Sequence, residues 1–288
     1  MTPDLSVIVA AVDGRDDVAA ALRAVREQDA SAQLEILLVA NSGHPGVGVA
    51  RAMDDVTVVV SDVPRLVPEL WGQGVAASRG EIVALTTTAC LPGAGWVQNL
   101  RRLHQDDVAA VGGPLVQQAP APVGDWALYY ARYGAFMPPA DTRPDAEVPG
   151  DNGSWKREAI APDLDDIGRR GFWELDVNAG LRRRGRRLLM HDDVTARHTH
   201  SFGVGAFCRQ RWEHGRLHGR SRAANGARRL LALAAPLAWG SMLLRVSRRV
   251  LVHRAHRATF ARALPVIALF YACWVGGEAL GLLDGGER

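Results

Sequence analysis

The sequence has few cysteines and lacks several features that mark whole classes of protein. Cys90, Cys208 and Cys273 are widely spaced and form neither a CxxC pair nor a Cys/His metal spacing. No disulfide framework is implied, and a reducing compartment fits. No internal repeat, low-complexity segment or nucleic-acid recognition module is found, so we expect no nucleic-acid partner. The N-terminus carries neither a basic segment nor a long apolar stretch, so we expect no signal peptide and a cytoplasmic first half.

What the chain does have is ample apolar material and unevenly placed charge. Of its 288 residues, 48% are hydrophobic, enough for one large α/β domain with an appendage. The net charge is only +3, but arginines cluster between Arg182 and Arg262 while Asp and Glu dominate the first half. A basic second half suggests an acidic partner such as a membrane surface, a nucleotide phosphate or a nucleic acid. For any single arginine, a solvated helix face is the alternative.

Short apolar runs alternate with amphipathic stretches over the first 111 residues. Continuous apolar runs predict buried strands, and apolar residues at helical spacing predict helices between them. The expected strands are 5–12, 34–39, 56–60, 81–85 and 108–111, and the expected helices are 16–26, 69–78 and 94–103. This alternation predicts an α/β fold, a mostly parallel central sheet with helices on both faces. Ligands bind beyond the C-terminal ends of such strands, so the loops 11–15, 40–46 and 86–92 are the ones of interest.

The C-terminal part differs in kind. After a Pro- and Ala-rich excursion at 114–149 and helical patterns at 172–184 and 205–217, residues 230–244 carry no charge. Residues 263–283 form a second apolar run with one charge, Glu278, and are long enough to cross a bilayer. Two apolar helices flanked by arginines predict a hairpin that dips into one membrane leaflet, and two helices buried against the globular domain are the alternative. We therefore divide the chain into a domain at 1–222 and membrane-associated helices at 223–288.

Several motifs in order resemble the family-2 glycosyltransferases, which have the Rossmann-like GT-A fold. The strand at 6–13 resembles the family's first strand and nucleotide-binding loop, and 35–43 resembles its second strand. The segment 74–85, followed by Pro92 and Trp96, is similar to the helix and strand that lead to the family's metal site. In the second half, 149–157 resembles an Asn-containing strand before a basic pair, and 194–198 a late strand ending in a histidine. The segment 274–281 is similar to the C-terminal helix of membrane-associated members.

The resemblance places a catalytic carboxylate at the start of the helix at 172–184. Glu174 lies 11 residues before Gly185 and matches the family's general base, with Asp176 as the second candidate on a different helix face. An acid stabilised by the helix dipole is the alternative reading of Glu174. The resemblance implies donor binding by Ala11, Asp13, Asn41, Thr86, Thr87, Thr88, Asn152, Lys156, Arg157, His198, Arg211 and Arg216.

Two departures from the family's pattern concern the metal. The metal-binding acids normally follow the fourth strand, but here that stretch is Thr86-Thr87-Thr88-Ala89-Cys90. Ala40 replaces the acid after the second strand. Divalent ions need hard oxygen ligands, usually carboxylates, so we expect no tightly bound metal, although the resemblance by itself implies Mg²⁺ or Mn²⁺.

The resemblance implies a glycosyltransferase that uses a nucleotide-sugar donor and a lipid-linked or envelope-glycan acceptor at the cytoplasmic face of the cell membrane. Cys208, Arg211 and Trp212 resemble the Gln-x-x-Arg-Trp signature of processive synthases, but cysteine replaces the glutamine, so we expect a non-processive enzyme. The alternative is a catalytically silent GT-A-like domain that serves as a membrane-associated binding or partner subunit.

Overall fold

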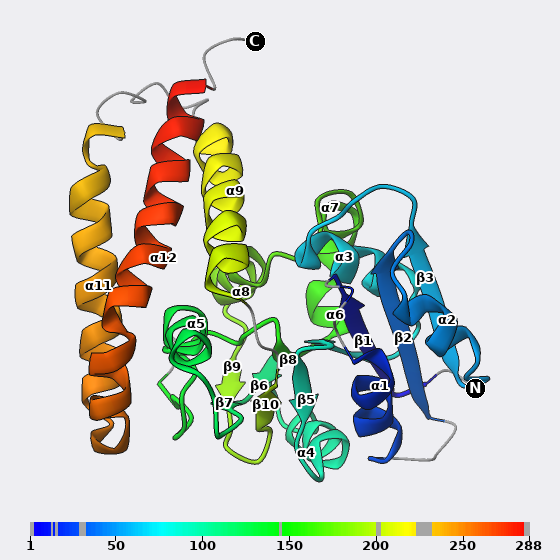
Figure 1. Ribbon diagram of the computed structural model, residues 1–288. Coiled ribbons are helices and arrows are strands. Elements are labelled where there is room, and N and C mark those ends of the chain that lie inside the picture. Colours follow the sequence, from blue (N-terminus) through cyan, green and yellow to red (C-terminus); the bar gives the residue numbers. More distant parts are fainter. Residues whose placement is uncertain are drawn as a thin grey trace. The chain divides into compact units, whose positions relative to one another are not determined.

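The structure is a computed structural model, and it describes residues 3–12, 14, 17–28, 33–143, 146–199, 203–222 and 232–284. Two compact units are present (Figure 1). The first unit comprises Met1–Val116 and Phe136–His200, and the second comprises Gln117–Ala135 and Ser201–Arg288. This grouping differs from the predicted division after residue 222, because two helices upstream of that point group with the C-terminal helices.

The first unit is built on a seven-stranded sheet with the order β3-β2-β1-β4-β8-β6-β9. Its strands are β1 (Leu5–Ala11), β2 (Leu34–Asn41), β3 (Val56–Ser61), β4 (Ile82–Thr87), β6 (Ala110–Gly112), β8 (Asn152–Lys156) and β9 (Leu188–Met190). Only β8 is antiparallel to its neighbours, β4 and β6. The prediction of a mostly parallel central sheet is confirmed. A small sheet joins β5 (Cys90–Pro92), β10 (Ala196–His198) and β7 (Leu115–Gln117).

Alternating residues of β1 point to two different cores, which shows that both faces of the sheet are covered. Val7 and Val9 pack into the cluster that holds α1 (Val18–Arg26), α2 (Gly46–Arg51) and α4 (Trp96–Leu103). Ile8 and Ala10 pack into the cluster that holds α3 (Val67–Ala77), α6 (Arg157–Ile160), α7 (Leu164–Arg170) and α8 (Glu174–Arg183). Successive side chains of a strand point to opposite faces, so one strand contributes to both cores.

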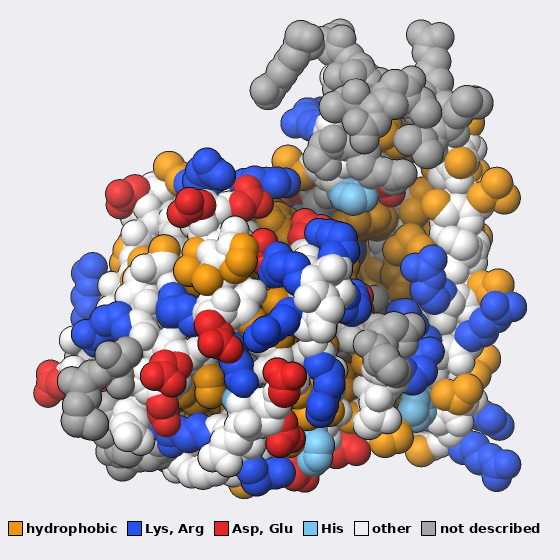
Figure 2. Space-filling view, turned by 180° about the vertical axis from the view of Figure 1, so that it is seen from behind, with side chains coloured by type: hydrophobic (Ala, Val, Ile, Leu, Met, Phe, Trp, Pro, Cys, Tyr) orange, Lys and Arg blue, Asp and Glu red, His pale blue; other side chains and the backbone are white. Residues whose placement is uncertain are grey.

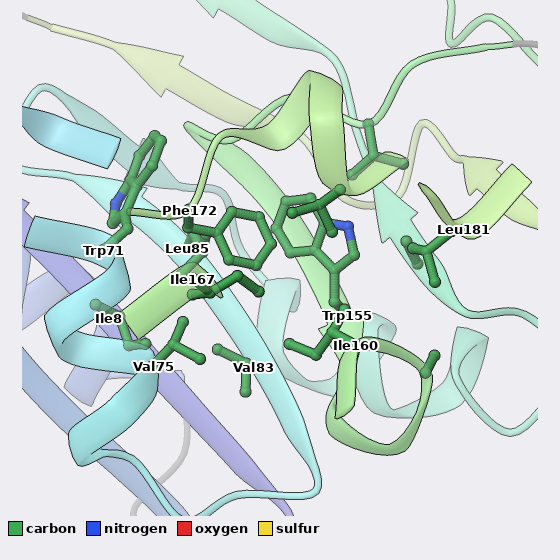
Figure 3. Packing of buried hydrophobic residues seen from close by; sticks show 14 of the residues in the cluster. Ile8, Trp71, Val75, Val83, Leu85, Trp155, Ile160, Ile167, Phe172 and Leu181 are labelled. Atoms are coloured by element: carbon green, nitrogen blue, oxygen red, sulfur yellow. The ribbon is translucent and has the colours of Figure 1, made fainter. Parts of the chain in front are cut away.

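Aromatic side chains fill the centre of the second cluster (Figure 3). The rings of Trp155 and Phe172 meet edge to face with centroids 4.7 Å apart. Both side chains are fully buried, and this contact joins β8 to the residues just before α8. The start of α8, where the candidate base lies, is therefore fixed by the core.

The second unit is helical. It consists of α5 (Val123–Tyr133), α9 (Val204–Arg222), α11 (Ala235–Leu251) and α12 (Arg257–Asp284), with a short 3₁₀ turn, η3 (Arg254–His256), between the last two. The two expected apolar helices are thus present, and α11 extends past the uncharged run to include Arg245, Arg248 and Arg249. In the part of the chain that the structure describes, Arg254–Asp284 is the one segment long and apolar enough to cross a membrane, a criterion that a buried core helix also meets.

Glycines allow α9 and α12 to pack backbone against backbone. A Cβ added to Gly215 or Gly219 of α9 would overlap backbone atoms of α12, and one added to Gly277 or Gly281 would overlap those of α9. Both helices therefore carry glycines four residues apart, a pattern that permits close approach of two helices. This close packing is why α9 groups with the C-terminal helices. The charge inside the apolar run, Glu278, has an oxygen 3.8 Å from His218 Nε2 of α9.

Candidate functional site

The C-terminal ends of β1, β2 and β4 meet at one edge of the large sheet. The register pairs Ala11 with Ala40 and Ala10 with Thr87, so these strands end level with one another. Since β8 is antiparallel, its first residue, Asn152, pairs with Thr86 and lies at the same edge. The predicted residues that the sheet gathers here are Ala11, Asn41, Thr86, Thr87, Thr88 and Asn152, whereas Asp13 lies outside the described residues.

Buried threonines and one carboxylate occupy the centre of this edge. Thr86 Oγ1 donates to the Cys90 carbonyl at 2.8 Å, and Thr87 Oγ1 donates to Asp151 Oδ1 at 3.3 Å. The side chains of both threonines and of Asp151 are buried. The stretch 86–90 has no acid of its own, and β8 brings the Asp151 carboxylate beside it. Asp151 directly precedes Asn152, which the resemblance singled out as a donor-binding residue.

Glu174 lies beside this group. It is the first residue of α8 and is half-buried. A Cβ added to Gly150 would lie 3.4 Å from the Glu174 carboxyl carbon and 2.6 Å from the Trp71 ring. The Trp71 indole in turn donates to the Thr86 carbonyl at 2.8 Å. The carboxyl group of Glu174 is therefore adjacent to Gly150, the residue before Asp151, whereas Asp176 is exposed.

The side-chain amides of the two asparagines at this edge form hydrogen bonds to other segments of the protein. Asn152 accepts from the Trp96 indole at 2.7 Å and donates to the carbonyls of Pro114 and Val194 at 3.1 and 2.7 Å. Asn41 accepts from the Arg65 amide at 2.8 Å and donates to the Arg65 carbonyl at 3.1 Å. Both therefore position loops around the site, and Asn152, which is fully buried, offers no surface to a donor.

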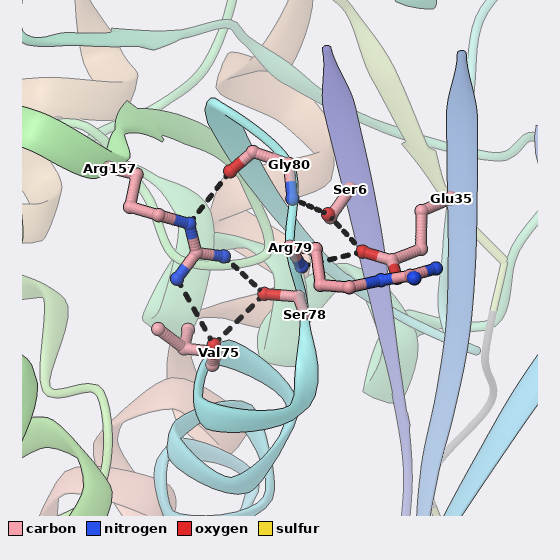
Figure 4. Close-up of polar contacts among 7 residues, drawn as sticks. All are labelled: Ser6, Glu35, Val75, Ser78, Arg79, Gly80 and Arg157. Atoms are coloured by element: carbon pink, nitrogen blue, oxygen red, sulfur yellow. Dashed lines mark hydrogen bonds and ion pairs between the residues drawn. The ribbon is translucent and has the colours of Figure 1, made fainter. Parts of the chain in front are cut away.

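Lys156 and Arg157 lie at the opposite edge of the sheet from Thr86 and Asn152. Lys156 pairs with Ile82, the first residue of β4, because the five-residue strand β8 begins at Asn152 and ends at Lys156. Arg157 donates to the Gly80 carbonyl at 2.7 Å and to Ser78 Oγ at 2.6 Å (Figure 4). Proximity in sequence grouped this basic pair with Asn152, and the direction of β8 separates the pair from it.

The remaining predicted cations are distributed over both units. His198 ends β10, is buried, and pairs with Cys90 beside the loop that follows β4. Arg211 and Arg216 lie on α9 in the helical unit. Arg216 forms an ion pair with Asp284, with Nη2 2.5 Å from Oδ2.

Arg65 is a cation at the sheet edge that the sequence analysis did not identify. It follows β3, and its backbone is held by Asn41. Its Nη1 contacts Glu69 at 2.9 Å, and its Nε is buried with no hydrogen-bond partner among the described residues. The signal available in the sequence was its position just after the third strand, at the edge where ligands bind.

Among the residues that the structure describes, the donor atoms at this edge do not fit a divalent metal site. Over the described ranges, no group of three or more His, Cys, Asp or Glu side chains is arranged to hold a metal ion. Threonine hydroxyls are weak ligands for Mg²⁺ or Mn²⁺, which prefer carboxylates and phosphate oxygens. Asp151, whose Oδ1 accepts from Thr87, brings one carboxylate to the threonine run.

Comparison with solved structures supports this reading of the fold. The chain is similar to the mannosyltransferase PcManGT from Pyrobaculum calidifontis, solved in complex with GDP-Man and Mn2+. The TM-score is 0.59 at 18% sequence identity, and the alignment covers 100% of this chain and 89% of that one. The fold is therefore GT-A-like. Comparison with protein-family models found no match, and comparison with curated proteins found none either.

Proposed function

We propose that the chain is a glycosyltransferase that moves a sugar from a nucleotide-sugar donor to an acceptor hydroxyl. The observation that carries this proposal is that the Glu174 carboxyl group lies beside Gly150, close to the edge of the sheet where β1, β2 and β4 end and β8 begins. The full-length likeness to a mannosyltransferase solved with GDP-Man supports a nucleotide-sugar as donor.

In this proposal Glu174 is the general base. Its carboxylate takes the proton of the acceptor hydroxyl as the hydroxyl oxygen attacks the anomeric carbon of the donor sugar. A new carbon–oxygen bond forms, and the bond between the anomeric carbon and the phosphate oxygen breaks. The nucleoside diphosphate leaves with that electron pair. Asp176, exposed and further along α8, has no part in the step.

The negative charge that develops on the departing diphosphate needs stabilisation by cations or hydrogen-bond donors. Arg65 has a buried Nε with no hydrogen-bond partner among the described residues, and His198 lies beside the loop after β4. We assign the leaving-group role to these two residues in place of Lys156 and Arg157. Catalysis without a tightly bound metal is part of the proposal, and the donor atoms at 86–90 are what support it.

The acceptor and the location are also proposals. The apolar segment Arg254–Asp284 and the arginines of α11 support association with the cytoplasmic face of a membrane. An enzyme held there reaches lipid-linked or envelope glycans, and we propose such an acceptor. Non-processive transfer remains our prediction from the cysteine at position 208.

A screen of nucleotide-sugars tests the proposal. The full chain would be incubated with each donor, with and without Mg²⁺ or Mn²⁺, and release of nucleoside diphosphate measured. We expect one class of donor to be hydrolysed. This hydrolysis should persist when a chelator removes divalent ions. Release from no donor would contradict the proposal and favour the silent binding or partner subunit, which the lack of a carboxylate in 86–90 would then explain.

A further inference from the structure

The helical unit contains an arginine-lined cavity of about 240 Å³. Arg132 of α5, Arg211 of α9, and Arg245 and Arg249 of α11 all line it, together with aromatic and aliphatic side chains such as Phe207 and Trp274. None of the lining residues is Asp or Glu. Four guanidinium groups thus share one cavity whose walls carry no negative charge.

Arg211 contacts two aromatic rings that line the cavity. Its guanidinium carbon is 4.9 Å from the centroid of the Phe207 ring and 5.2 Å from that of Trp274. Its Nε is buried and has no hydrogen-bond partner among the described residues. An unpaired buried donor on a charged group is costly, and the cost disappears when an acceptor with negative charge is present.

The group that Arg211 does contact cannot supply that charge. Its Nη2 donates to His214 Nδ1 at 3.4 Å. Burial, the Arg211 charge and the Arg132 charge lower the pKa of His214 to about 4, so this imidazole is neutral at pH 7. Burial and Arg132 lower the pKa of Arg211 to about 10, which leaves its guanidinium protonated at pH 7. The cavity therefore stays positively charged.

The helical unit that contains the cavity also has exposed apolar surface. Leu237, Leu244 and Val252, on or beside α11, are 78%, 51% and 70% exposed. Hydrophobic and basic side chains are interspersed along the edge that α11 forms, at the right of Figure 2. Apolar helix faces with arginines between them are typical of segments that meet lipid headgroups.

We propose that this arginine cavity binds a phosphate group, and we expect an anionic membrane lipid to carry it. Guanidinium groups bind phosphate oxygens bidentately, and a dianionic phosphate would pair with the unpartnered Nε of Arg211. The volume is below the roughly 300–1,000 Å³ of pockets that hold whole drug-sized ligands, so a headgroup phosphate fits better than a nucleotide. The proposal does not depend on sugar transfer.

The test compares two neighbouring arginines of α11. Arg249 lines the cavity, whereas Arg248 is also exposed and does not line it. The substitutions Arg249→Gln and Arg248→Gln therefore remove the same charge from the same helix. The full chain and both variants would be bound to vesicles of phosphatidylcholine with and without phosphatidic acid. In parallel, thermal unfolding in detergent would be followed with and without inorganic pyrophosphate.

We expect Arg249→Gln to weaken binding to phosphatidic acid vesicles by about 10-fold. Arg248→Gln should weaken it by a few-fold at most, because an arginine near an anionic surface contributes about 1 kcal/mol without any specific contact. If pyrophosphate raises the Tm of the parent and of Arg248→Gln but not that of Arg249→Gln, the cavity binds phosphate, and a soluble phosphate can also occupy it. Equal effects of the two variants in both assays, or none, would overturn the proposal, because the arginines would then act only as a diffuse basic surface. No donor or sugar enters the assay, so its outcome is separate from that of the donor screen.

Discussion

Gly281 of α12 faces the backbone carbonyl of Arg216 of α9 so closely that a Cβ at position 281 would overlap the carbonyl oxygen. Gly240 of α11, also within a helix, has nothing within 4 Å of an added Cβ. The same substitution should therefore have opposite effects at the two positions.

Gly240→Ala should raise the free energy of unfolding by up to about 1 kcal/mol, because alanine favours the helix. Gly281→Ala gains the same helix propensity but forces α9 and α12 apart, and overpacking of this kind costs about 1–3 kcal/mol. Thermal unfolding of the two variants beside the parent checks this. A stabilised Gly281→Ala would show that the helices do not pack in this way.

His104 should make the protein less stable in mild acid. Its Nε2 donates to Ser154 Oγ at 2.8 Å, because that hydroxyl donates its own proton to the Val111 carbonyl. Burial lowers the pKa of His104 to about 3, and the charge of Lys156 acts in the same direction. The unfolded chain takes up this proton below about pH 6.5 and the folded protein does not, so the free energy of unfolding falls as pH drops from 6.5 toward 3.

At pH 5 the loss from this one group amounts to about 2 kcal/mol. His104→Gln keeps a donor for Ser154 and removes the titration, so its stability should change less between pH 6.5 and pH 5 than that of the parent. Denaturant unfolding at the two pH values measures the difference. Parallel losses in parent and variant would mean that His104 is protonated in the folded protein.

Arg157 should matter for stability and not for donor binding. Its guanidinium holds the Gly80 carbonyl and Ser78 Oγ at the edge opposite the candidate site. Arg157→Ala should lower the free energy of unfolding by about 1.5–3 kcal/mol, the usual worth of hydrogen bonds from a charged group. The KM for the donor should stay within about two-fold of the parent value, since Asn152 and Arg157 are separated by the length of β8. A large rise in KM with unchanged stability would show that Arg157 contributes to donor binding.

Divalent ions should bind weakly. The threonines of 86–90 offer neutral oxygens, and the carboxylate of Asp151 accepts a hydrogen bond from Thr87. Titration calorimetry with Mn²⁺ in the presence of nucleoside diphosphate checks this. Micromolar affinity that is lost in Asp151→Asn would contradict the prediction and make Asp151 a metal ligand.

The central sheet was predictable because its signal is local. Continuous apolar runs predicted β1, β2 and β3 to within two residues at each end, and the alternation with helices predicted that both faces would be covered. The start of α8 at Glu174 was two residues inside the predicted helix, and the family spacing had already singled out this residue.

What could not be predicted depends on contacts between distant segments. The direction of β8, which separates Arg157 from Asn152, is set by its pairing with β4 and not by its own residues. The amide of Asn152 looked available in the sequence, yet a tryptophan and two carbonyls from other segments occupy it. The role of the glycines of α9 and α12 becomes visible only in the structure, where the two helices pack against each other at these positions.

The measurement that tests the account most directly compares Glu174→Gln with Asp176→Asn in a transfer assay with the donor that the screen identifies. Glu174→Gln keeps the shape of the side chain beside Gly150 and removes the base, so turnover should fall by about 10²–10⁴-fold while donor affinity barely changes. Asp176→Asn should retain most of the activity, because this exposed side chain lies about 200° around the helix from Glu174. Parental turnover in Glu174→Gln, or a greater loss in Asp176→Asn, would contradict the assignment of Glu174 as the base.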